Sequence, residues 1–456
     1  MAVELHIDVE TFSSVNIKTC GAYKYMESPD FEIIILAYCI KRNGKKGPIR
    51  VIDLLQNECA PNEFYEALHD PKVEKHAHNA TFERLAFKAI GHDIPAEQWH
   101  CSAVKASYCG LPMALGVLST VLDLGEQAKS AEGTALIRYF SCLVKPTKAN
   151  GFRCRNLPKR NPEKWERYKY YCGQDVVAEM AVQDETDCFE FPDEERLNYA
   201  LDQKINDRGI MLDVEMAANA VKIDDLFKAD IIEQLKEATG LVNPNSPAQL
   251  KKWLSDEMRQ NITSLAKNTV ESLIKKHKAG AAVEVEYTPL KLKGKISLSD
   301  SIEKQRAFLK ANGYRNYWTD DDWVERGKKV TSDYQGVTTE RLIKRLLELD
   351  GIKTSKNGNY RKAVEVLKLR QLGSKTSTKK FTAMANYATD TDRAHGLLQF
   401  YGAGRTGRWA GRAVQLQNLP RNKMKLLNLA RELVKANDYD SLFMMFTNVS
   451  KVLSEL

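Results

Sequence analysis

The sequence has 456 residues and a formal net charge of +8, because 68 lysines and arginines outnumber 60 aspartates and glutamates. A chain of this length predicts about three domains with cores of their own, which excludes a disulfide-stapled mini-protein. The moderate basic excess favours a polyanionic partner, and a solvated lysine-rich surface is the alternative.

The cysteines and the apolar runs indicate the compartment. All nine cysteines lie between Cys20 and Cys188, and none has Cys-x-x-Cys spacing, so we expect reduced thiols rather than a zinc knuckle or a disulfide framework. The longest aliphatic run is far shorter than the roughly 20 residues that span a bilayer. The N-terminus also lacks the basic-then-apolar pattern of a signal sequence. These features predict a soluble intracellular protein with no membrane partner.

The first predicted strand ends in two carboxylates. Apolar and polar residues alternate over residues 3–10, and this period of two places Asp8 and Glu10 on one face. Two adjacent acids repel each other unless a proton or a cation lies between them, and carboxylate oxygens suit hard ions such as Mg²⁺ or Mn²⁺. A solvated strand edge is the alternative interpretation of this short pattern.

Strand and helix patterns continue to about residue 190. We expect strands at Phe31–Ile40, Pro48–Leu55 and Val73–His78, and helices at Glu63–Leu68, Ala80–Ile90, Gly133–Phe140 and Glu163–Phe189. The first two of these strands are joined by a polar turn and form a hairpin. Strands followed by alternating helices predict a mixed α/β sheet.

Two further motifs within this region carry acids. Asn79 ends a predicted strand, and Glu83 lies one turn into the helix that follows. Tyr171 and Asp175 are four residues apart on a predicted helix, so a phenol and an acid can point at one reaction centre. A helix cap at Asn79 and a core position for Tyr171 are the alternatives.

Taken in order, Asp-x-Glu, Asn-x-x-x-acid and Tyr-x-x-x-Asp resemble the three exonuclease motifs of the DEDD superfamily, in its tyrosine-bearing branch. The resemblance covers about residues 1–190. It implies a ribonuclease H-like fold and two-metal phosphodiester hydrolysis with Mg²⁺ or Mn²⁺. By this resemblance Asp8 bridges both ions, Glu10 and Asp175 complete the tighter one, Glu83 supports the second through water, and Tyr171 orients the attacking water.

One position departs from that family, which usually has Asp where this chain has Glu83. The extra methylene moves the carboxylate by about 1.5 Å, one carbon–carbon bond. We therefore expect this departure to act on the affinity for the second metal ion. Thr11 and Asn79, which neighbour the acids in the sequence, are expected to contact nucleic acid.

After residue 190 the cysteines stop and charged helices begin. We expect helices at Glu194–Arg208, Glu215–Thr239, Ala248–Met258, Thr339–Leu349 and Tyr360–Gln371, with a short strand or turn at residues 209–213. Residues 279–336 are poor in aliphatic side chains and lack a helical period, which predicts an insertion or a flexible subdomain.

A glycine-rich basic segment follows near the C-terminus. Glycines let a backbone approach a duplex closely, and interleaved Arg, Gln and Asn can donate to minor-groove acceptors. The expected DNA contacts are Arg405, Thr406, Arg408, Arg412, Gln415, Gln417 and Asn418. A basic loop without a ligand is the alternative. The segment resembles the Thr-Gly-Arg…Leu-Gln-Asn-(Ile/Leu)-Pro sequence that opens the palm of family A DNA polymerases, most closely those of bacteriophages.

The resemblance as a whole implies three parts. They are a 3′–5′ exonuclease domain at residues 1–190, a mainly α-helical linker and thumb region at residues 191–395, and the first part of an α+β palm at residues 396–456. The expected setting is the cytoplasm of a bacterial cell or a phage-infected host.

The later acidic and fingers motifs of family A polymerases do not occur before Leu456. We therefore expect a proofreading-type DNA exonuclease that forms the front portion of a replicative polymerase and does not extend a primer by itself. Its expected partners are a single-stranded 3′ end and a primer–template duplex. The alternatives are half of a split polymerase completed by a second chain, or a non-catalytic DNA-binding remnant.

Overall fold

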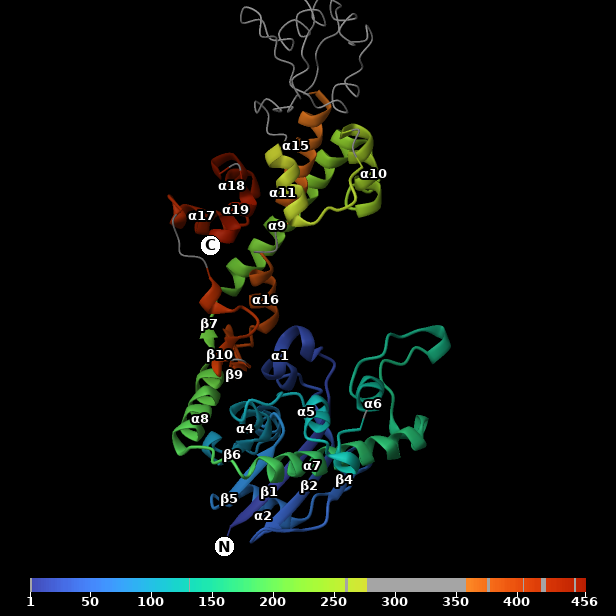
Figure 1. Ribbon diagram of the computed structural model, residues 1–456, viewed down its shortest axis with the longest axis vertical. Helices are drawn as coiled ribbons and strands as arrows, with labels where there is room; N and C mark the ends of the chain where they lie inside the picture. Colours follow the sequence, from blue (N-terminus) through green and yellow to red (C-terminus); the bar gives the residue numbers. More distant parts are fainter. Residues whose placement is uncertain are drawn as a thin grey trace, which may run out of the picture. The chain divides into compact units, whose positions relative to one another are not determined.

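The computed structural model describes residues 2–130, 132–258, 261–276, 358–374, 378–404, 406–419, 424–446 and 448–456. Helices and one larger mixed sheet make up the described chain (Figure 1). The predicted insertion at residues 279–336, the predicted helix Thr339–Leu349 and Arg405 lie outside the described residues. No helix in the described ranges has the length and apolar character that a membrane crossing needs.

The larger sheet has the strand order β3-β2-β1-β5-β6, and β4 also pairs with β2. Its strands are β1 (Val3–Phe12), β2 (Glu32–Arg42), β3 (Lys45–Lys46), β4 (Arg50–Asp53), β5 (Val73–Ala77) and β6 (Trp99–Cys101). Strand β2 is antiparallel to β1, β3 and β4, whereas β1, β5 and β6 are parallel to one another. The mixed α/β prediction and the predicted hairpin are confirmed.

Several helices of the first 208 residues lie close to their predicted ranges, namely α2 (Asn62–His69), α3 (Thr81–Ala89), α6 (Gly133–Phe140), α7 (Pro162–Thr186) and α8 (Asp193–Arg208). The sequence analysis did not predict α1 (Ile17–Met26), α4 (Ser102–Tyr108) or α5 (Leu115–Val121). Helix α7 begins where the Asn161 side chain accepts from the Lys164 amide, with Pro162 at its first position.

Strand β1 lies inside the sheet, between β2 and β5, and both of its faces are covered. Leu5, Ile7 and Val9 are at most 5% exposed and belong to the apolar core that also contains side chains of α1, α2 and α3. The opposite face of β1 meets α7, which crosses the sheet in Figure 1. A solvated strand edge, the alternative interpretation of Asp8 and Glu10, is therefore not what the chain forms.

The face of β1 that meets α7 is polar, and we call this contact the polar seam. Its pairs are Glu4 with Gln183, His6 with Glu179, Asp8 with Cys172, and Glu10 with Tyr168. The six residue steps from Glu4 to Glu10 advance about 20 Å along the strand, and the fifteen residue steps from Gln183 back to Tyr168 advance about 22.5 Å along the helix. A strand and a helix that run in opposite directions can therefore keep polar residues matched over this length.

The remaining elements are mostly helical. They are β7 (Ile210–Met211), α9 (Val214–Thr239), α10 (Pro247–Met258), α11 (Lys267–Lys276), α15 (Gly358–Gly373), α16 (Lys379–Tyr387), β8 (Arg393–Ala394), β9 (Leu398–Ala403), β10 (Arg408–Gly411), α17 (Leu427–Lys435), α18 (Tyr439–Phe446) and α19 (Val449–Glu455). Contacts divide the chain into two compact units, Met1–Ile223 with Ser377–Leu456, and Asp224–Thr376. In the first unit Phe400 of β9 joins the apolar core of the sheet. In the second, α15 packs against α10 and α11.

An ion pair joins α3 to α8 within the first unit. Arg84 is 3% exposed and forms two hydrogen bonds with Asp207, Nη1 to Oδ2 at 2.9 Å and Nη2 to Oδ1 at 2.7 Å. Tyr23 on α1 donates its hydroxyl to the same carboxylate at 2.6 Å. Burial alone raises the pKa of Asp207, but the Arg84 guanidinium and the Tyr23 hydroxyl hold it below its usual value.

We expect Asp207→Asn to lower the free energy of unfolding by about 3 kcal/mol near pH 7, because a buried guanidinium loses its charged partner. The pKa of Asp207 is depressed in the folded state. Its contribution is therefore present above the ordinary carboxyl pKa of about 4 and is lost as the pH falls through the folded-state value. Urea unfolding of both proteins at neutral and at acidic pH measures the difference.

The matched control is Asp225→Asn, since Asp225 is exposed on α9. It should leave the free energy of unfolding within about 0.5 kcal/mol of the unmodified chain. An equally small loss for Asp207→Asn, or a loss that persists unchanged in acid, would contradict the proposed contribution of the Arg84–Asp207 pair to the free energy of unfolding.

Candidate active site

Three elements bring the four predicted carboxylates together. Asp8 and Glu10 lie on β1, Glu83 in the first turn of α3, and Asp175 on α7. Burial raises the pKa of Asp8 well above its usual value, and the charges of Asp175, Glu10 and Glu83 raise it further. The four groups therefore lie near enough to repel one another, and we call them the acidic quartet.

Glu10 and Glu83, the two glutamates of the quartet, are both buried, with 8% and 4% of their surface exposed. Burial is the largest cause that raises the pKa of Glu10, to about 8, against a hydrogen bond from the Tyr168 hydroxyl at 2.5 Å. Burial also raises the pKa of Glu83 well above its usual value, and Glu10 adds to the shift. Holding these groups ionised requires a cation close to them.

Lys129 supplies one positive charge. Its ammonium group contacts Asp175 Oδ2 and lies 4.8 Å from the centre of the Tyr171 ring. Burial raises the pKa of Asp175, while Lys129 and then Tyr171 lower it, and the pKa stays above its usual value. One lysine therefore offsets only part of the negative charge of the quartet.

The quartet has the donor atoms for a hard divalent ion. Two of its oxygens, Glu83 Oε2 and Asp175 Oδ1, are buried without a hydrogen-bond partner in the described part of the chain. A donor set made only of carboxylate oxygens suits Mg²⁺ or Mn²⁺. Among the described residues, the two groups of three ligand atoms within 4.8 Å of one another lie outside the quartet. An ion would therefore have to draw the acids closer.

Several residues at this site escaped the sequence analysis. Tyr168 and Cys172 contact Glu10 and Asp8, and both lie on the face of α7 that also carries Asp175. Their spacing of three or four residues from the predicted Tyr171 and Asp175 is a helical signal that could have identified them. Lys129 lies in a loop after Gln127, and no local pattern connects it with the quartet.

Two predicted nucleic-acid contacts lie beside the quartet in sequence but differ in exposure. Thr11 is buried, and its hydroxyl is 2.9 Å from that of Tyr25. Asn79 is exposed and has a φ of 68°, the left-handed region that asparagine tolerates better than most residues. Only Asn79 of the two therefore presents its side chain at the surface.

The predicted palm segment forms the β9–β10 hairpin and the turn after it. Its described candidates are all exposed, namely Thr406, Arg408, Arg412, Gln415, Gln417 and Asn418. Trp409 anchors the hairpin, because its indole N–H donates to Asp202 Oδ1 at 2.8 Å and its ring packs against Phe400. At Gly411 a Cβ would lie 2.1 Å from the amide end of the Gln417 side chain, so a larger residue would require that exposed side chain to move.

Comparison with known proteins gives one strong match. No protein-family model matches the chain. The chain is 40% identical over 453 residues to the DNA polymerase of Bacillus phage SP02 and is its homologue. A solved structure of the POL domain of Pol1 from M. smegmatis, in complex with a DNA primer–template and dNTP, is 12% identical, with a TM-score of 0.35 over 93% of this chain and 53% of that one. A TM-score this low does not establish a shared fold. The match to the phage polymerase covers 99% of this chain and 56% of that protein, so the chain spans about half the length of its curated relative.

Proposed function

We propose that the chain is a metal-dependent 3′–5′ DNA exonuclease of the proofreading type, and that it is the part of a family A DNA polymerase that precedes most of the palm. The observation that carries the proposal is the acidic quartet, in which carboxylates from β1, α3 and α7 lie close enough that their charges raise the pKa values of Asp8, Glu10 and Glu83. Homology to a phage DNA polymerase supports DNA as the substrate and replication as the setting. We assign the nuclease to a ribonuclease H-like domain at residues 1–190.

The proposed chemistry is hydrolysis of the terminal phosphodiester. Two divalent ions, Mg²⁺ or Mn²⁺, would supply an activated water and relief of charge on the leaving 3′ oxygen. Asp8 would bridge the two, with Glu10 and Asp175 on one and Glu83 on the other. Tyr171, 2% exposed and beside Asp175, would orient the attacking water through its hydroxyl.

The C-terminal region would hold the duplex. We assign residues 191–395 to a linker and thumb and residues 396–456 to the first part of a palm. The exposed Arg408 and Arg412 would contact phosphates, and the amides of Gln415, Gln417 and Asn418 would reach minor-groove acceptors. A second chain that completes a split polymerase and a DNA-binding remnant without catalysis are the rival functions. Primer extension by the purified chain, alone and with a candidate second chain, tests the first rival.

We expect Asp8→Ala to reduce degradation of a 5′-labelled single strand by at least about 100-fold, because the residue proposed to hold both ions is lost. The assay follows shortening of the strand from its 3′ end in Mg²⁺ and in Mn²⁺, with circular dichroism to verify folding. Asp93→Ala, at an exposed surface carboxylate paired with Lys88, is the matched control and should keep full activity. Full activity in the Asp8 variant would remove the quartet from the mechanism, whereas no degradation by the unmodified chain would leave the DNA-binding remnant as the better interpretation.

A separate prediction concerns the Tyr171 hydroxyl. Tyr171→Phe should lower the hydrolysis rate while leaving measurable activity, since the carboxylates remain. A Cβ at Gly133 would lie 2.2 Å from the Tyr171 ring, so Gly133→Ala should displace that ring and give a similar partial loss. At Gly116 of α5 the nearest neighbouring atom to an added Cβ is 3.9 Å away, which makes Gly116→Ala the control. Equal rates for Gly133→Ala and Gly116→Ala would remove Tyr171 from the mechanism.

For the hairpin we expect Arg408→Ala to weaken binding to a primer–template duplex. The slope of log K against log salt should fall by about one, because one phosphate contact is lost. Cleavage of a saturating single strand should change little. Lys72→Ala, at an exposed lysine distant in sequence from the hairpin, is the control. A salt slope that is the same in both variants would mean that the hairpin does not touch DNA.

A further inference from the structure

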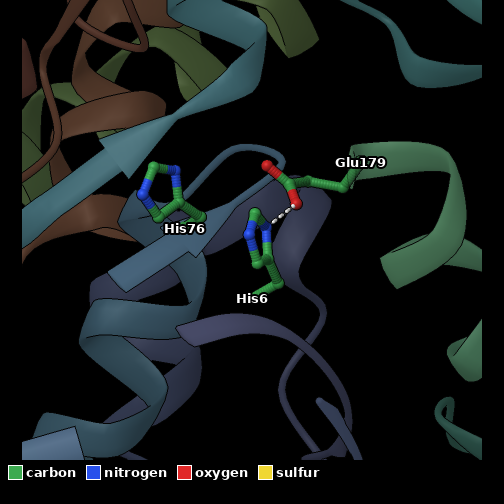
Figure 2. Close-up of side chains that lie close together, drawn as sticks. All are labelled: His6, His76 and Glu179. Atoms are coloured by element: carbon green, nitrogen blue, oxygen red, sulfur yellow. Dashed lines mark hydrogen bonds and ion pairs between the residues drawn. The ribbon is translucent and has the colours of Figure 1, made fainter. Parts of the chain in front are cut away.

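A second cluster of ligand-type side chains lies on the polar seam, closer to the start of β1 than the quartet. His6 on β1, His76 on β5 and Glu179 on α7 converge from three elements (Figure 2). All three are buried, and each offers one ligand atom such that these atoms lie within 4.8 Å of one another. We call these three residues the histidine cluster.

The same short pattern, Glu-x-His, holds both imidazoles. It occurs at residues 4–6 and again at residues 74–76, and the parallel register places Glu4 beside Glu74 and His6 beside His76. The two rings stack with centroids 4.9 Å apart. In each pattern the glutamate approaches Nε2 of its own histidine, at 3.4 Å for residues 4 and 6 and at 3.3 Å for residues 74 and 76. A carboxylate at Nε2 favours the proton there and leaves Nδ1 to act as a ligand.

Glu179 closes the cluster from α7. Its Oε2 lies 2.7 Å from His6 Nδ1, the contact that is dashed in Figure 2. Its Oε1 is buried without a hydrogen-bond partner among the described residues. Such an atom costs free energy unless a proton or a cation satisfies it. A cavity of about 100 Å³ lies beside the cluster, and its lining includes His76 and Glu179 but not His6. It has room for water molecules next to these two ligands.

We propose that His6, His76 and Glu179 form a binding site for one zinc-type divalent ion, distinct from the acidic quartet. Two imidazole nitrogens and a carboxylate match the preference of Zn²⁺, and a water from the cavity would complete four ligands. The proton between His6 Nδ1 and Glu179 leaves to solvent when the ion binds. Glu4 and Glu74 then accept from the Nε2–H groups and hold the rings in place.

The site joins β1 and β5 to α7, so an ion there would hold the helix against the sheet. We therefore expect bound zinc to raise the midpoint of thermal unfolding.

A neighbouring group of ligand-type side chains is less suited to bind a metal ion. Glu74, His76 and His100 also have ligand atoms within 4.8 Å of one another. However, Arg196 donates to His100 Nδ1 at 2.6 Å, so the proton of a neutral His100 lies on Nε2, the nitrogen that faces Glu74. An ion at Nε2 would have to displace this proton while the guanidinium occupies the other nitrogen. An ion at His6 Nδ1 also displaces a proton, but the other ring nitrogen of His6 faces the Glu4 carboxylate and not a guanidinium.

The test uses the full chain with Asp8→Asn and Asp175→Asn, which weaken the quartet. This background protein is equilibrated with Zn²⁺ in excess Mg²⁺, dialysed, and analysed for bound metal by mass spectrometry. We expect one zinc ion per chain, and Co²⁺ in its place should give the visible absorption of a four-coordinate nitrogen–oxygen site. His76→Asn and Glu179→Gln should each weaken zinc binding by more than about 100-fold, beyond the loss typical of an outer-shell partner.

His100→Asn is the matched control and should keep the zinc affinity and the cobalt spectrum. Circular dichroism verifies that each variant is folded, and His76 lines the cavity, so its substitution disturbs the core less than substitution of the fully buried His6. A folded background protein that binds no zinc overturns the proposal. So does unchanged binding in His76→Asn, or loss of binding in His100→Asn alongside retention in Glu179→Gln.

Discussion

The structure depends on a polar contact between a strand and a helix that are both buried. Strand β1 directs four side chains toward α7, and each forms a hydrogen bond with a side chain of the helix. The four are Glu4, His6, Asp8 and Glu10. The six residue steps of the strand from Glu4 to Glu10 advance about 20 Å, close to the roughly 22.5 Å of the fifteen residue steps of the helix from Tyr168 to Gln183, so the match extends over four pairs. Because unsatisfied polar groups are costly in a core, this contact fixes the register of α7 on the sheet.

The composition of the seam changes along its length, and the preferred cation changes with it. Near Asp8 and Glu10 the ligands are carboxylates, which favour hard ions bound through oxygen. Two residues earlier, His6 and Glu179 offer nitrogen and oxygen, which suit zinc. Asp175 and Glu179 are one helical turn apart on α7. One strand and one helix can therefore carry two sites of different chemistry, separated by about 7 Å along the strand.

The rest of the first unit holds these elements in place. The Arg84–Asp207 pair joins α3, which carries Glu83, to α8, and the Tyr23 hydroxyl adds α1 to the same carboxylate. Helix α8 in turn receives the hairpin, because Trp409 donates to Asp202. Residues assigned to nucleic-acid contact thus lie on a support that is continuous with the sheet.

The sequence by itself determined β1, β2, β4, β5, α2, α3, α6 and α7 of the first 190 residues, because alternation and helical spacing are local properties that burial enforces. It did not predict α1, α4, α5 or β6. It also selected the five residues proposed for catalysis, since each motif is short and contiguous. Only the tertiary structure decided that β1 is an inner strand, that Thr11 is buried while Asn79 is exposed, and that Lys129 contacts Asp175. It alone also placed the two Glu-x-His patterns in register on neighbouring strands. Pairing between distant segments depends on packing and not on local pattern, so no single stretch of sequence contains it.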